Sequence, residues 1–76
     1  MNNQRREKLR KAEQALNAAS EYIEDVLDEE QDSLDNIPEN LQGSNRYEQM
    51  EIAVDKLNEA IDQIESVKEC LDEAVG

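Results

Sequence analysis

Apolar residues return every seven positions in two long stretches of the chain. In the first stretch, one row is made by Leu9, Leu16 and Ile23, a companion row by Ala12, Ala19 and Val26, and Ala15, Tyr22 and Leu27 widen the stripe. In the second stretch, the rows are Met50, Leu57, Ile64 and Leu71, then Ala53, Ala60, Val67 and Ala74, widened by Val54, Ile61 and Val75. A seven-residue apolar repeat is typical of amphipathic helices that pack as in coiled coils. The pattern therefore predicts two helices.

One short segment, residues 36–44, interrupts the repeat. It holds the only proline and the first of two glycines. Pro38 disfavours helical geometry at Ile37, so the first helix should end just before it. Either Ser44 or Asn45 can cap the second helix, and Asn45 would place Glu48 at the capping-box position. We expect helices over about 4–35 and 45–75, a turn over about 36–44, and a single domain over 1–76.

Two helices of similar length joined by a short turn predict an all-α, antiparallel, coiled-coil-like hairpin. In it Ile23 should lie near Leu57, and Ile37 and Leu41 should cover the turn. The stripe of the second helix is three rows wide, which is more than one partner helix covers. We therefore expect a homodimer that forms a four-helix bundle; the alternative is a hairpin that completes its core on another protein. The residues expected to carry self-association are Leu9, Leu16, Ile23, Met50, Leu57, Ile64 and Leu71.

Composition excludes several classes of function. The chain has 76 residues, with 20 acidic and 8 basic side chains, no His, Trp or Phe, and a single cysteine. A disulfide scaffold, a Cys/His zinc site and a histidine-based catalytic triad all lack the residues they require. No run approaches the length of a membrane span. We expect no enzyme activity, no cofactor and no metal.

Charge is unevenly distributed along the chain. Residues 1–11 carry a net charge of +4, residues 12–45 carry −10 and residues 46–76 carry −6. We expect the basic start to form cross-helix ion pairs with the acidic end of the second helix, which holds Glu65, Glu69, Asp72 and Glu73. This acidic balance argues against direct binding to nucleic acid or to an anionic membrane.

The middle of the chain holds a block of carboxylates that has two interpretations. Its candidate residues, named here the acidic surface, are Glu24, Asp25, Asp28, Glu29, Asp32 and Asp35. They are either a solvated face or a docking surface for a basic protein, which they would bind by mimicking nucleic-acid phosphates. Part of this block also matches calcium-loop spacing, but Ser33 stands where the loop needs glycine, so we expect no calcium site.

The turn and the second helix carry a resemblance. The run Ile37-Pro38-Glu39-Asn40-Leu41-Gln42-Gly43-Ser44, followed by Arg46-Tyr47-Glu48 and an acidic amphipathic helix, resembles small acidic helical proteins of Firmicutes phages and mobile elements. That family has no established activity, so the resemblance transfers no functional residues. It implies a phage or prophage setting. The charged start, without an apolar signal segment, and the lone Cys70 favour the cytoplasm.

Two functional hypotheses follow from the sequence. The first is a non-enzymatic interaction module, a helical hairpin that self-associates. The second is an acidic inhibitor that occupies the nucleic-acid-binding site of a host defence protein or another basic protein.

Overall fold

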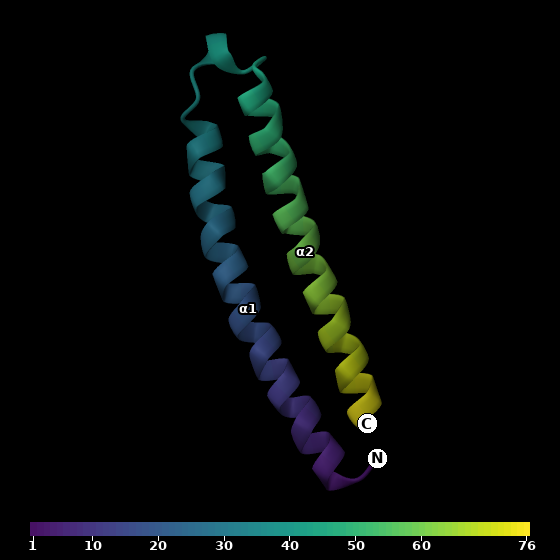
Figure 1. The fold of residues 1–76 in the computed structure, drawn as a ribbon. Helices are drawn as coiled ribbons and strands as arrows, with labels where there is room; N and C mark the ends of the chain where they lie inside the picture. Colours follow the sequence, from purple (N-terminus) through teal and green to yellow (C-terminus); the bar gives the residue numbers. More distant parts are fainter.

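The computed structural model describes all 76 residues as two long helices that lie side by side and run in opposite directions (Figure 1). Helix α1 spans Asn3–Asp35, the short 3-10 helix η1 spans Glu39–Leu41, and α2 spans Asn45–Val75. The molecule measures 59 × 16 × 13 Å, with both termini at one end and the turn at the other (Figure 1). The expected all-α, two-helix hairpin is confirmed. Neither helix has an apolar segment long enough to cross a membrane.

Local polar contacts define where each helix begins and ends. The side chain of Asn2 accepts a hydrogen bond from the Arg5 amide at 2.8 Å and caps α1. Ser44 Oγ accepts from the Tyr47 amide at 3.2 Å, so Ser44 rather than Asn45 caps α2. Such caps satisfy amide donors that the first helical turn leaves free. At the end of α1, the Asn36 side chain donates to the Asp32 carbonyl oxygen at 2.8 Å.

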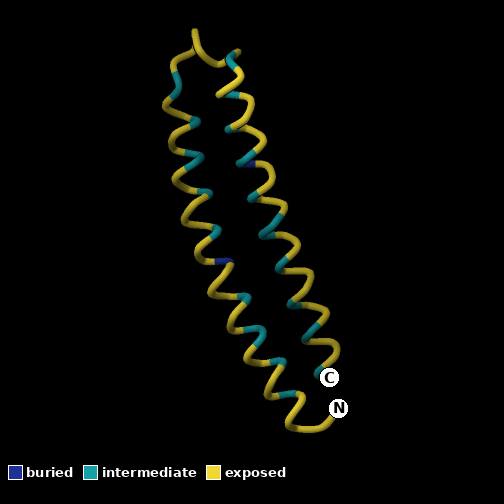
Figure 2. Tube along the Cα trace, in the orientation of Figure 1, coloured by how far each residue is buried: buried dark blue, intermediate teal, exposed yellow.

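The helices meet along one seam of buried and half-buried residues (Figure 2). Along each helix these residues follow one another at spacings that alternate between three and four positions. On α1 the seam holds Arg6, Leu9, Glu13, Leu16, Ser20, Ile23, Leu27, Glu30 and Leu34. On α2 it holds Tyr47, Met50, Val54, Leu57, Ile61, Ile64, Lys68, Leu71 and Val75. This spacing is the coiled-coil repeat that the sequence predicts.

The second row of the α1 seam differs from the expected one. Ala19 and Val26, expected in the companion row, are exposed. The row that packs instead lies on the other side of the Leu9 row and is made by Arg6, Glu13, Ser20, Leu27 and Leu34. This register brings Leu27 and Leu34 to the side of α2 that offers valine, isoleucine and tyrosine. Burial of these large side chains removes more apolar area from water than burial of alanines would.

The core of the hairpin is thin. Only Val54 and Ser20 are buried, with 6% and 7% of their surface exposed, and no large side chain is fully enclosed. The accessible surface is 5863 Å². A compact monomer of this mass exposes about 4,700 Å². The isolated hairpin therefore leaves about a quarter more surface in water than a compact protein of its size.

Candidate interaction surfaces

The seam divides the remaining surface of the hairpin into two unlike faces. Because the helices are antiparallel, residues that precede the Leu27 and Val54 rows by one position lie on the same side of the hairpin. On that side small and apolar residues gather, named here the apolar face: Ala12, Ala19 and Val26 of α1, and Ala53, Ala60, Val67 and Ala74 of α2. Ala15 and Tyr22, which precede Leu16 and Ile23, add a further row to this face on α1. Tyr22 is 75% exposed, and Val26 and Val67 are about half exposed. Ala12, Ala53 and Ala60 are half-buried and the other residues of the face are exposed, so the hairpin has a second apolar surface that the monomer covers only in part.

The opposite side is polar. A hollow of about 270 Å³ opens there between the helices, lined only by polar residues: Asn17, Ser20, Glu21, Glu24, Glu65 and Lys68. On this side Lys68 Nζ contacts Glu65 Oε1 at 3.1 Å within α2. The two sides of one thin seam therefore differ completely in chemistry.

The seven residues expected to carry self-association lie in the seam, in the rows next to the apolar face. Leu9, Leu16 and Ile23 on α1 and the Met50 row on α2 are half-buried, and none is enclosed. In the coiled-coil repeat these rows occupy the edge of the seam next to the alanine rows. Each helix consequently presents three adjacent rows of apolar residues, and the opposite helix covers only part of them.

The apolar face continues into a hollow beside the turn. This hollow has a volume of about 390 Å³ and is lined by Ser33, Ile37, Pro38, Leu41, Ser44, Arg46 and Met50. Ser33 and Arg46 extend the rows that contain Ala19 and Ala53. The expected cover over the turn is incomplete, because Ile37 is half-buried whereas Leu41 is 51% exposed.

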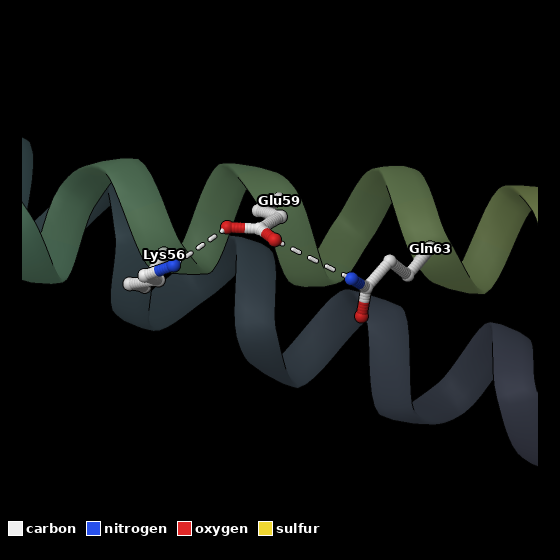
Figure 3. Close-up of polar contacts among 3 residues, drawn as sticks. All are labelled: Lys56, Glu59 and Gln63. Atoms are coloured by element: carbon white, nitrogen blue, oxygen red, sulfur yellow. Dashed lines mark hydrogen bonds and ion pairs between the residues drawn. The ribbon is translucent and has the colours of Figure 1, made fainter.

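The prediction of ion pairs between the basic start and the acidic end of α2 is wrong. None of the three salt bridges joins the two helices: one lies within α1 and two lie within α2, each between residues three positions apart. One belongs to an exposed ladder in which Glu59 accepts from Lys56 at 3.0 Å and from Gln63 at 3.5 Å (Figure 3). Lys8 and Lys11 occupy helix positions that face away from α2, so their ammonium groups cannot reach its carboxylates.

One basic side chain does cross the seam. Arg6 Nε donates to the carbonyl oxygen of Val75 at 3.3 Å, at the C-terminal end of α2. That helix end carries unpaired carbonyl groups and partial negative charge, which a guanidinium group stabilises. This contact joins the two chain ends without any carboxylate.

The acidic surface is fully exposed on α1 near the turn. All six of its residues are exposed, and none takes part in a salt bridge. The only side-chain hydrogen bond to it is from Gln31 Nε2 to Asp35 Oδ1 at 2.9 Å. The turn end of the molecule, residues 24–55, holds eleven acidic residues and one basic residue, a net charge of −10. The terminal end, residues 1–11 and 66–76, carries +2.

One carboxyl group of the seam, that of Glu13, lies near the termini beside the exposed Asp72. A hydrogen bond between the Glu13 and Asp72 carboxyls, which requires a proton on one of them, raises the pKa of Glu13. Partial desolvation and the negative charge of Asp72 raise this pKa further, whereas Lys68 and Arg10 oppose the shift. The folded hairpin therefore holds a proton more tightly at this site than the unfolded chain does.

This proton makes stability depend on pH. An acid whose pKa is higher in the folded state destabilises the fold as pH rises from the unfolded pKa through the raised one. We expect thermal stability to fall as pH rises above 4.5, the ordinary pKa of a glutamate side chain, and Glu13→Gln to flatten this dependence. Thermal melts at a series of pH values above 4.5 check it. Glu73→Gln removes one charge at an exposed position of the same end, and an equal flattening in that control would contradict the role of Glu13.

No catalytic or metal-binding arrangement stands out from the remaining residues. No group of three or more His, Cys, Asp and Glu side chains is placed to hold a metal ion. Cys70 is exposed and has no second cysteine to pair with. Glu30 is half-buried in the seam, and Tyr47 is half-buried at the start of α2.

Comparison with protein-family models, curated proteins and solved structures finds no match.

Proposed function

We propose that this chain is a non-enzymatic protein–protein interaction module whose hairpins self-associate through the apolar face into a homodimeric four-helix bundle. The observation that supports this most directly is the apolar face itself, which follows both helices on one side of a thin core. Apolar residues that gather on one side of a soluble protein are typical of an interaction surface. A second hairpin that packs on this face would complete the core.

The side of the hairpin that carries the apolar face is large enough for a stable interface. That side measures 59 by 16 Å, or about 900 Å² in projection, and the apolar face occupies the part of it between Ala12 and Val26 on α1 and between Ala53 and Ala74 on α2. Stable protein–protein interfaces cover about 800 Å² on each partner. The alanines let backbones approach closely, and Val26, Tyr22 and Val67 add larger contacts. The seven half-buried residues at the edge of the face, Leu9, Leu16, Ile23, Met50, Leu57, Ile64 and Leu71, would lose their remaining exposed surface inside the bundle.

Self-association should make thermal stability depend on protein concentration. For a folded dimer that unfolds to separate chains, mass action raises Tm as concentration increases. We expect Tm to rise by several degrees between about 2 and 200 µM chain, measured by circular dichroism. Equal Tm values over this range would contradict the proposal, because a monomeric hairpin unfolds independently of concentration.

A second candidate function rests on the acidic surface. Its six carboxylates are exposed, lack ion pairs and lie within three turns of α1, as a docking surface for a basic protein requires. Such a chain would act as a nucleic-acid mimic on a host defence protein or a DNA-binding protein, and the resemblance to phage proteins supports a bacterial cytoplasm as the setting. Reversing Asp25, Asp28, Glu29 and Asp32 to lysine should abolish capture of a basic partner. Capture that survives this change and is insensitive to salt would contradict mimicry.

A further inference from the structure

We infer that the two hairpins of the dimer run in opposite directions, the turn end of each copy against the terminal end of the other, with α1 packed on α1 and a two-fold axis near Ala19. This inference rests on the proposed self-association and adds its geometry. It also names the occupant of the apolar face, a second copy of this chain. The observations that carry it are the distribution of charge along the hairpin and the composition of α1 on this face.

Only two symmetric arrangements let two hairpins share this face. A two-fold axis parallel to the helices places the two turn ends together and packs α1 on α2. An axis perpendicular to the helices, in the plane of the interface, places each turn end against a terminal end and packs each helix on its own counterpart. A closed dimer with identical contacts on both copies requires one of these axes.

Charge distinguishes the two arrangements. The turn end carries −10 and the terminal end carries +2, at opposite ends of a molecule 59 Å long. Turn against turn would bring two strongly acidic ends together, within a distance at which physiological salt screens poorly. Turn against terminus instead brings each acidic end beside a basic one. Complementary charge of this kind specifies orientation by excluding the alternative.

The rows of α1 on the apolar face are arranged symmetrically about Ala19. The small and apolar residues from Ala12 to Val26 extend one heptad in each direction from it. Beyond them the row of Ala15 and Tyr22 ends in Lys8 on one side and Glu29 on the other, eleven and ten residues from Ala19. At 1.5 Å per residue both lie about 16 Å from the axis. Lys8 of one copy therefore lies beside Glu29 of the second copy, twice per dimer.

This pairing gives Lys8 an opposite charge that the single hairpin does not offer it. Lys8 and Lys11 face away from α2 and make no salt bridge within the chain. Within one chain, Lys8 and Glu29 are about 32 Å apart along the helix, so they cannot pair. In the inferred dimer, Lys8 and Glu29 each lie beside an opposite charge of the second copy. Part of the acidic surface therefore faces that copy.

Disulfide trapping tests the orientation. The background variant Cys70→Ser removes the native thiol, and Ala19→Cys places one thiol at the inferred axis, where two helices approach within disulfide distance. The matched control, Asn17→Cys in the same background, lies one half-turn away on the polar side. We expect Ala19→Cys to form a covalent dimer under mild oxidation and Asn17→Cys to remain mostly uncross-linked on non-reducing gels.

The outcomes separate this inference from the proposed function. Cross-linking at Ala19→Cys but not at Asn17→Cys supports the opposed arrangement. A dimer by light scattering that does not cross-link at Ala19→Cys overturns the orientation and leaves self-association standing. A monomer in the Cys70→Ser background overturns both. Equal cross-linking at both positions overturns the orientation, because it indicates random collision rather than a defined contact.

A charge exchange provides a second, independent test. Glu29→Lys should raise the dimer Kd about tenfold, because it sets lysine against lysine twice per dimer. Combining it with Lys8→Glu should restore the original Kd. The control Glu21→Lys makes the same change in net charge on the polar side and should not weaken the dimer. Equal effects of Glu29→Lys and Glu21→Lys, or no rescue by the double variant, would overturn the pairing.

Discussion

Replacing Val54 by aspartate is expected to unfold the hairpin. Val54 is the most buried apolar residue of the chain, with 6% of its surface exposed, and it lies in the α2 half of the seam. A carboxylate at this position would lose water without gaining a partner, at a cost of several kcal/mol. A core this thin leaves little stability to absorb such a loss. The helical signal in circular dichroism at 25 °C should largely disappear.

The matched control for this prediction is Ile52→Asp. Ile52 lies two residues earlier on the same helix but is 58% exposed and faces away from the seam. The change adds the same charge in the same helical segment, so it isolates burial from helix propensity and net charge. Ile52→Asp should retain the helical signal. Loss of structure in both variants, or in neither, would show that the seam around Val54 does not hold the hairpin together.

Replacing Ala19 by aspartate is expected to separate the dimer while leaving the helices intact. Ala19 is exposed in the hairpin, so the substitution removes no contact between α1 and α2. On the apolar face, however, it places one carboxylate from each copy in a dry interface. The desolvation penalty should raise the dimer Kd about a hundredfold or more. Sedimentation or light scattering at micromolar concentration measures this directly.

The control for Ala19→Asp is Asn17→Asp. Both variants add one negative charge to α1, two residues apart, but Asn17 lines the hollow on the polar side. Asn17→Asp should leave the dimer intact. Part of the cost of Ala19→Asp is the lower helix propensity of aspartate, about 0.6 kcal/mol, which the helical signal reports separately. Equal dissociation in the two variants would show that the apolar face is not the contact surface.

The fold could be predicted from the sequence because its signals are local and strong. The heptad rows define both helices, and Pro38 with the residues after it defines the turn. The sequence leaves two candidates for the cap of α2, Ser44 and Asn45, since both residue types cap helices and only the backbone at the start of α2 distinguishes them.

The register of α1 was not predictable from the same pattern. Apolar residues lie on both sides of the Leu9, Leu16 and Ile23 row, so the sequence shows three candidate rows and cannot tell which one meets α2. The structure resolves this through the partner helix, where the large side chains of the Val54 row meet Leu27 and Leu34. Ala19 and Val26 of the companion row are thereby exposed. That displaced row is the basis of the proposed interface.

Cross-helix ion pairing was predicted wrongly for a related reason. Proximity of the basic start to the acidic end of α2 follows from the topology, but pairing depends on which way each side chain points. Lys8 and Lys11 project from the far side of α1, and only Arg6 lies on the seam, where it contacts the Val75 carbonyl. Net charge along a sequence therefore locates charged ends without identifying pairs.

The most direct test of self-association is the molar mass of the wild-type chain in solution, measured by light scattering between about 2 and 200 µM. The proposed bundle predicts twice the chain mass of 8.7 kDa across most of this range. A mass of 8.7 kDa at every concentration, with helical structure retained, would contradict it. The apolar face would then stay exposed in the isolated chain.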